Sequence, residues 1–295
     1  MNIQKIFFKT QDQAELVGLL HTGEKTNKVI IAVHGMTSDC LKKRDDIIAR
    51  TMVANKIDYF TFNNRGHDAM SYLGKEMQGV YAKQKCGTAN EDVKDSYYDI
   101  KAAIDEMLEK GYEEIYLQGH SLGCTKIVYT YNKLKAKNNE KYINSIKAVM
   151  LLSLVDMPRA QEINLAGKYN YMLNYAMEKE KHGEHEQFMP EEAFIHPITV
   201  KTYLRYFRDN QEIDFAKYSV PDYTYPELNN ITVPLFMRWG TVFEMIEQPA
   251  EELVEMMNKK ITNPNKDINF ITGANHGYTD KEQELADEML KFLVK

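Results

Sequence analysis

The chain has 295 residues, 43% of them hydrophobic and 27% charged, which is ordinary for a globular protein and long enough for one large α/β domain or a domain with an insert. Its formal net charge of −6 gives no reason to expect nucleic acid or an anionic membrane as a partner. The N-terminus lacks the apolar core of a signal peptide, no stretch is apolar enough to cross a membrane, and three widely spaced cysteines form no disulfide framework. We therefore expect a cytoplasmic protein.

The first half of the chain alternates strand and helix patterns. Two short apolar runs separated by polar residues predict an antiparallel hairpin at a sheet edge, at 6–10 and 14–20. Longer apolar runs predict strands covered on both faces, at 28–33, 57–62, 114–118 and 146–155. Helical patterns lie between them, at about 41–55, from 88 to about 110, and from 124 onward. This alternation predicts a mostly parallel, doubly wound sheet.

The helix that ends near Lys110 has a capping-box pattern at its start. Thr88 is followed three residues later by Glu91, the spacing at which a hydroxyl and a carboxylate satisfy the free amides of a helix N-terminus. Apolar residues at three- and four-residue spacing follow, from Val93 to Met107. We expect Thr88 and Glu91 to cap this helix.

The alternation stops after Asp156 and resumes after Asn230. The segment 157–230 is rich in charged and aromatic residues and shows no strand-helix rhythm. Beyond it, the patterns predict a strand at 231–240, a helix at about 249–259, a strand at 268–271 and a closing helix at 281–294. We predict one α/β core domain formed by 1–156 and 231–295, with 157–230 inserted as a helical cap.

A serine elbow lies between the predicted strand 114–118 and the helix after it. The sequence Gly119-His120-Ser121-Leu122-Gly123 has the form G-x-S-x-G, in which a tight strand-to-helix turn leaves no room for side chains at the two glycines. The turn exposes the serine above the sheet edge at a helix N-terminus, where amide dipoles favour developing negative charge. Ser121 is therefore the predicted nucleophile.

A serine hydroxyl is a weak nucleophile and needs a base, which in turn is oriented by an acid. In hydrolases built on this elbow, the chain order is serine, acid, histidine. His276 lies in the Gly-rich loop 273–277, between the last predicted strand and the last helix, at the same end of the sheet as Ser121. The other histidines precede Ser121 or lie in the segment 157–230. His276 is the predicted base.

Two carboxylates compete for the role of the acid. Glu244 is the first carboxylate after the strand that ends at Gly240, which is the expected place. Asp156 ends the preceding strand, a position that some members of the fold use instead. Both lie at carboxyl ends of strands, where functional groups collect in open α/β sheets. We favour Glu244 and keep Asp156 as the alternative.

An oxyanion hole needs two backbone N–H groups aimed at the carbonyl oxygen of the substrate. One is expected from Leu122, directly after the nucleophile. The other is expected from the loop after the strand 28–33, where Met36 follows His34-Gly35.

Four motifs together resemble the α/β-hydrolase superfamily, in its serine esterase, lysophospholipase and aminopeptidase-like branch. They are His34-Gly35-Met36-Thr37-Ser38, Asn64-Arg65-Gly66-His67, Gly119-His120-Ser121-Leu122-Gly123 and Gly273-Ala274-Asn275-His276-Gly277. The resemblance covers nearly the whole chain and is weakest between Met157 and Asn230, where the family carries its variable cap. It implies the same roles for the nucleophile, the base and the two oxyanion donors.

One departure from the family pattern concerns the acid. The family usually has Gly-x-x-Asp after the strand that ends here at Gly240, whereas this sequence reads Gly240-Thr241-Val242-Phe243-Glu244. Phe243 therefore holds the usual acid position. Either Glu244 takes over with a one-residue shift, or Asp156 serves, or the triad is incomplete, which would cost up to ~10⁴ in rate.

These patterns predict a serine hydrolase that cleaves a small carboxylic ester through an acyl-enzyme, with no cofactor and no metal. Its expected partner is a small-molecule ester, without nucleic acid or membrane. A thioesterase, amidase or peptidase would need the same machinery. A catalytically weak binding or sensor protein of the same fold is the alternative from another class, and Phe243 motivates it.

Overall fold

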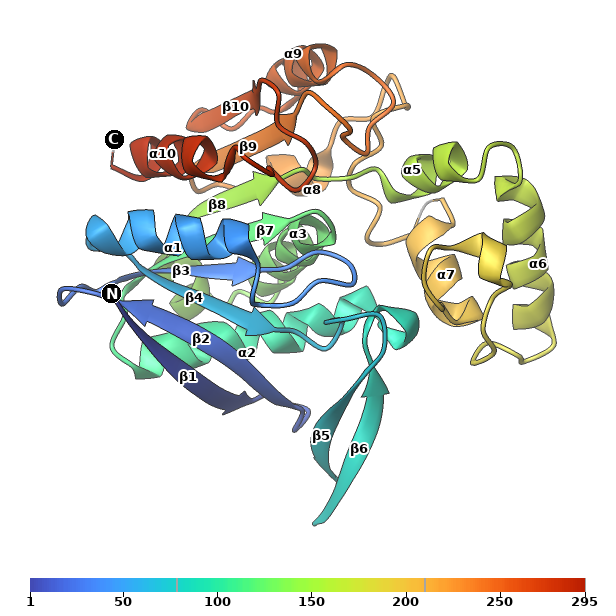
Figure 1. Cartoon of the computed structure of the whole chain (residues 1–295), viewed down its shortest axis with the longest axis horizontal. Coiled ribbons are helices and arrows are strands. Elements are labelled where there is room, and N and C mark those ends of the chain that lie inside the picture. Colours follow the sequence, from blue (N-terminus) through green and yellow to red (C-terminus); the bar gives the residue numbers. More distant parts are fainter. Residues whose placement is uncertain (78, 210, 295) are drawn as a thin grey trace.

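A sheet of eight strands runs through the computed structural model, which describes residues 1–77, 79–209 and 211–294 (Figure 1). In spatial order, the strands are β1 (Asn2–Lys9), β2 (Glu15–Thr22), β4 (Asp58–Asn63), β3 (Lys28–Val33), β7 (Glu114–His120), β8 (Ile146–Leu152), β9 (Leu235–Gly240) and β10 (Lys266–Ile271). β1 pairs antiparallel with β2, and β2 with β4; from β4 to β10 all neighbours are parallel. The predicted edge hairpin and mostly parallel sheet are confirmed.

Helices cover both faces of the sheet, as predicted for a doubly wound α/β fold. On one face lie α1 (Lys43–Ala54) and α10 (Glu282–Leu293); on the other lie α2 (Ser96–Glu109), α3 (Leu122–Ala136) and α9 (Ala250–Lys260). A short helix, α4 (Glu140–Ser145), leads into β8. Within the described ranges, no helix has the length and apolar character needed to cross a membrane.

Alternation along the strands separates two apolar cores. On β3, Val29, Ile31 and Val33 join the core under α2 and α3, whereas Ile30 and Ala32 join the core under α1 and α10. Successive side chains of a strand point to opposite faces, so a strand covered on both faces must be apolar throughout. This is why the central strands read as near-continuous apolar runs in the sequence.

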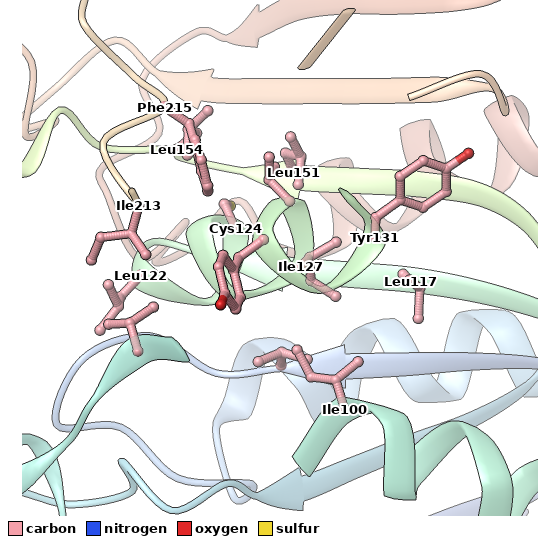
Figure 2. Close-up of a cluster of buried hydrophobic side chains, with 14 of the residues drawn as sticks. Ile100, Leu117, Leu122, Cys124, Ile127, Tyr131, Leu151, Leu154, Ile213 and Phe215 are labelled. Atoms are coloured by element: carbon pink, nitrogen blue, oxygen red, sulfur yellow. The ribbon is translucent and has the colours of Figure 1, made fainter. Parts of the chain in front are cut away.

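Residues 122–131 of helix α3 are all buried, which fixes the turn before the helix. Figure 2 shows Ile127 of α3 between Ile100 of α2 and the strand residues Leu117 and Leu151. Cys124, also on α3, is fully buried, as expected for a small residue that packs the helix on the sheet. Because α3 begins directly after the predicted nucleophile, this packing holds the elbow in place.

The described residues between β8 and β9 include helices rather than further strands. They are α5 (Met157–Asn164), α6 (Tyr169–Lys181), α7 (Val200–Phe207) and α8 (Pro226–Asn229). In Figure 1, α5, α6 and α7 stand together beside the carboxyl ends of the parallel strands, while α8 lies back against α3. The described part of 157–230, the predicted cap segment, is thus helical and lies at the end of the sheet where the site residues are expected.

The helix expected from Thr88 begins only at Ser96. Residues 88–95 instead form two short 3-10 turns, and neither Thr88 nor Glu91 caps a helix. The carboxylate of Glu91 forms an ion pair with Lys126 of α3 and accepts a hydrogen bond from the Tyr206 hydroxyl of α7. Partners from distant parts of the chain have overridden the local capping preference.

A second antiparallel hairpin, β5 (Ser71–Met77) with β6 (Val80–Cys86), was not predicted. It projects from the core next to the β1–β2 edge (Figure 1). The side chains of β6 are exposed except for Cys86. A strand without a buried face produces no apolar alternation, so the sequence carried no signal for it.

Lys126 is a fully buried cation between α3 and α7, the helix that carries Tyr206. Its side chain is 0% exposed, it pairs with the equally buried Glu91, and its Nζ donates a hydrogen bond to Asn64 Oδ1 at 3.0 Å. A buried pair is costly to break from one side, because the remaining charge cannot be solvated.

Replacing Lys126 by Met is therefore expected to lower the free energy of unfolding by about 3–5 kcal/mol, because Glu91 keeps a buried, unpaired charge. Urea unfolding measures this loss. The matched control is Lys259→Met, whose pair with Glu255 is open to solvent and should contribute almost nothing. Equal losses in the two variants would contradict the importance of the buried pair.

Candidate active site

Ser121 sits in a strained backbone conformation at the end of β7. Its φ of 54° and ψ of −124° lie outside the regions that non-glycine residues favour. A Cβ on Gly119 would lie 2.5 Å from the carbonyl oxygen of Gly123, and a Cβ on Gly123 would lie 2.2 Å from that of Val33. Both glycines are thus sterically required, as the elbow motif predicts, and they let the turn carry the serine to the first turn of α3.

The loop after β3 passes directly over the elbow. A Cβ on Gly35 would approach the Ser121 Cβ to 2.9 Å, so the two segments touch. Leu122 is the first residue of α3, where a helix leaves its amides without partners. Across the described ranges, the N–H groups of Met36 and Leu122 donate to no acceptor. The two predicted oxyanion donors therefore flank the serine with free amides.

Glu244 and His276 are in direct contact. His276 follows β10, and its Nδ1 hydrogen-bonds to Glu244 Oε1. The other carboxylate oxygen of Glu244 accepts hydrogen bonds from the Ser153 hydroxyl and the Gly240 N–H, each at 2.8 Å. Among the described residues, the alternative acid, Asp156, forms no hydrogen bond or ion pair with His276 and instead accepts the backbone N–H groups of Arg159 and Tyr218. Of the two candidates, the structure brings Glu244 to the histidine.

A left-handed turn accounts for the displaced position of the acid. Phe243, which stands at the usual acid position, has a φ of 52° and its side chain is 90% exposed. The turn directs Phe243 into solvent and Glu244 inward, where its side chain is only 4% exposed. Just before the turn, the Val242 N–H donates to the Ala274 carbonyl at 2.9 Å and ties this loop to the histidine loop. The one-residue shift is thus accommodated by the backbone.

Glu244 is held as a carboxylate despite its burial. Burial by itself raises the pKa of Glu244, but the hydrogen bond and charge of His276 act in the opposite direction. The Gly240 N–H and the Ser153 hydroxyl add to this, so that the pKa of Glu244 falls below its usual value. An ionised acid on Nδ1 fixes the tautomer of His276 with Nε2 free to accept a proton.

Two residues that belong to no recognised sequence motif, Ser153 and Tyr278, support the acid. Ser153 has a φ of 54°, which ends β8 and turns its hydroxyl toward Glu244. That hydroxyl also lies 3.0 Å from the Tyr278 hydroxyl, which donates to the Arg238 carbonyl at 2.8 Å. The apolar run predicts a strand over 146–155, which includes Ser153, whereas β8 ends at Leu152. A polar residue inside such a run was the available signal.

Asp156 instead organises the base of the cap segment. It caps α5 by accepting the Arg159 N–H at 3.2 Å, and it accepts the Tyr218 N–H at 3.1 Å from the returning chain. Burial raises the pKa of Asp156 to about 6, partly offset by the Arg159 N–H and reinforced by the charge of Asp214. Asp156 thus links the chain that enters the segment 157–230 at α5 with the chain that leaves it near Tyr218.

A cavity of about 820 Å³ opens beside Ser121 and His276. Its core wall includes Gly35, Met36, Thr37, His120, Met245 and Gly277. Its other wall comes from the segment between β8 and β9 and includes Met157, Ala160, Gln161, Leu165, Ala193, Phe194, Ile195 and Phe207. The cavity lies between the carboxyl ends of the strands and the predicted cap segment 157–230, and it is largely apolar, which suits an apolar group on a reacting molecule.

The hydrogen bond expected between the Ser121 hydroxyl and His276 Nε2 is not formed. In the described parts of the chain, neither the Ser121 hydroxyl nor His276 Nε2 has a hydrogen-bond partner, although both residues line the cavity. Catalytic hydrogen bonds of this kind are often loose until substrate binds. The same parts of the chain hold no group of three or more His, Cys, Asp or Glu side chains able to bind a metal ion.

Comparisons with known proteins agree with this architecture. The sequence model of the lecithin:cholesterol acyltransferase family matches residues 86–295. No curated protein matches the sequence.

Among solved structures, the esterase Est1E of Butyrivibrio proteoclasticus with bound ferulic acid is 15% identical, covering 98% of this chain and 100% of its own, with a TM-score of 0.61. The α/β hydrolase GrgF of Penicillium sp. sh18 is 14% identical, covering 99% and 98%, with a TM-score of 0.67. A soluble variant of monoglyceride lipase from Saccharomyces cerevisiae is 14% identical, covering 99% and 96%, with a TM-score of 0.66. These likenesses support the α/β-hydrolase fold predicted from the motifs.

The raised pKa of Asp156 predicts a specific pH dependence of stability. The folded protein keeps a proton up to about pH 6 that the unfolded chain releases near its ordinary pKa of 3.8. The contribution of Asp156 is therefore fully present below about pH 4 and is lost as the pH rises through 6, a change of about 3 kcal/mol. Urea unfolding of wild type and Asp156→Asn between pH 4 and 7 measures it. Parallel pH profiles for the two proteins would contradict the assignment.

Proposed function

Because the chain belongs to the lecithin:cholesterol acyltransferase family and has the α/β-hydrolase fold, we propose that it is a serine hydrolase. It would cleave a carboxylic ester through an acyl-enzyme. The observation that carries the proposal is the Glu244–His276 hydrogen bond beside an elbow serine on the wall of one cavity. Each of these parts has other uses, but together they are what acyl transfer from an ester requires.

In the first half of the reaction, Ser121 Oγ attacks the ester carbonyl carbon while His276 Nε2 takes its proton. The carbonyl oxygen becomes an oxyanion, which the N–H groups of Met36 and Leu122 stabilise. Glu244 stays ionised and offsets the positive charge of the protonated imidazole. The intermediate collapses, the carbon–oxygen bond to the alcohol breaks, and the alcohol leaves with the proton from His276. The acyl group remains on Ser121.

In the second half, water attacks the acyl carbon while His276 accepts its proton. The same two amides stabilise the second oxyanion, and collapse releases the carboxylic acid and restores Ser121. His120 supports the loop that carries the base, because its Nε2 donates a hydrogen bond to the His276 carbonyl at 2.7 Å. Burial, with the charges of Arg44 and His276, keeps the pKa of His120 well below its usual value, so it stays neutral and adds no competing charge.

The cavity suggests an ester with an apolar acyl or alcohol group. Its volume of about 820 Å³ lies in the range of sites that enclose most of a small organic ligand. Residues from both core and cap line it, so substrate choice depends on the cap. Thioesters and amides require the same machinery and remain competing substrate classes. The binding or sensor alternative is less favoured. It was suggested by Phe243 at the usual acid position, but Glu244 provides a carboxylate that hydrogen-bonds to His276.

A fluorophosphonate probe tests the proposal directly. The probe traps a serine that a base activates, so we expect the wild-type protein to be labelled and Ser121→Ala to remain unlabelled. The control Ser145→Ala removes a buried serine outside the cavity and should label like the wild type. A folded wild-type protein that does not react would refute the enzyme assignment.

The choice of acid is tested by kinetics on a short-chain p-nitrophenyl ester. Glu244→Gln should lower kcat, by up to ~10⁴, with little change in KM, because an amide neither fixes the histidine tautomer in the same way nor offsets the imidazolium charge. Asp156→Asn should leave kcat within a few-fold of the wild type. The reverse pattern, in which only Asp156→Asn collapses kcat, would identify Asp156 as the acid.

A further inference from the structure

The side chain of Thr88 contacts the loop after β3, which carries the proposed oxyanion donor Met36. The Thr37 N–H donates a hydrogen bond to Thr88 Oγ1 at 2.8 Å, and that hydroxyl donates in turn to the Gly66 carbonyl at 3.2 Å. Thr88 is 0% exposed, so no water competes for these bonds. The hydroxyl is used as acceptor and as donor, which fixes its orientation.

The residue that Thr88 holds is strained and follows the oxyanion donor. Thr37 has a φ of 54°, a left-handed conformation that is unfavourable for a β-branched residue. Such a conformation persists only where surrounding contacts determine it. On the other side of Met36, the Gly35 backbone passes so close to Ser121 that an added Cβ would lie 2.9 Å from the Ser121 Cβ. The direction of the Met36 N–H therefore depends on two anchors, the Gly35 contact and the Thr88 hydrogen bond.

Thr88 is itself part of a rigidly held segment. The next residue, Ala89, accepts hydrogen bonds from both the N–H and the hydroxyl of Thr199 at the start of α7, each at 2.9 Å. Two residues further on, Glu91 accepts the hydroxyl of Tyr206, also on α7, and pairs with the buried Lys126. The segment is thus held between cap and core and gives the Thr88 hydroxyl a fixed position relative to the loop.

We propose that Thr88 is a positioning residue of the oxyanion hole, whose hydroxyl fixes the Thr37 peptide and thereby aims the Met36 N–H at the substrate oxygen. The inference rests on the proposed hydrolase function and adds to it a residue outside the triad. An amide that is poorly aimed stabilises the transition state less but affects substrate binding little, because full negative charge develops only during reaction. The effect should therefore appear in kcat.

The experiment compares Thr88→Ala with Thr88→Ser, which keeps the hydroxyl. Removing a whole oxyanion donor costs about 10²–10³ in kcat, so misaligning one should lower kcat by about tenfold or more in Thr88→Ala, with KM nearly unchanged. Thr88→Ser should recover most of the loss. A trifluoromethyl ketone, which forms an oxyanion adduct with the serine, should bind Thr88→Ala more weakly in the same proportion.

The control is Thr130→Ala, which removes an equally buried threonine on α3 whose hydroxyl has no hydrogen-bond partner in the described ranges. We expect Thr130→Ala to keep the wild-type kcat; a fall of equal size there would overturn the inference. A wild-type kcat in folded Thr88→Ala, or a loss that Thr88→Ser does not repair, would also overturn it. If Thr88→Ala does not fold, Thr88→Val, which keeps the side-chain shape, takes its place in the comparison.

The outcome is separable from that of the proposed function. Wild-type protein that reacts with the fluorophosphonate probe, combined with unchanged kinetics in Thr88→Ala, would remove the role of Thr88 and leave the hydrolase assignment intact. Unreactive wild-type protein would remove both.

Discussion

The hydrogen bond between Glu244 and His276 orients the base of the proposed active site. It joins loops after two neighbouring parallel strands, β9 and β10, and it keeps a buried carboxylate ionised. The cost of burying that charge is offset by four donors, among them the Ser153 hydroxyl and the Gly240 N–H. Without such an arrangement, the carboxyl would take up a proton and the histidine would lose its fixed tautomer.

Strained backbone recurs at each corner of the site. Thr37, Ser121, Ser153 and Phe243 all have φ values near +50° although none is glycine, and each stands just after a parallel strand of the sheet. Parallel strands deliver their carboxyl ends to one edge, where functional loops gather. The strain costs free energy at each position and persists because buried hydrogen bonds and close packing determine the turns. The rigid two-sided core supplies that support.

Much of this arrangement could be predicted because it depends on local pattern. Near-continuous apolar runs gave the central strands, and the glycines around Ser121 follow from sterics alone. The acid stayed open, since sequence spacing does not show that the backbone turns left-handed at Phe243 and moves Glu244 inward. Thr88 and Glu91 matched a capping box but found distant partners instead. Ser153 was hidden in an apolar run, because its role comes from the neighbouring strand.

Nuclear magnetic resonance of the histidine ring protons reports directly on the hydrogen bond between Glu244 and His276. A proton held between His276 Nδ1 and a buried carboxylate exchanges slowly and resonates far downfield of a solvent-exposed imidazole proton. We expect such a resonance in wild type and in Asp156→Asn, and its loss in Glu244→Gln. A resonance that survives in Glu244→Gln but disappears in Asp156→Asn would contradict this expectation, and would place Asp156 at the histidine.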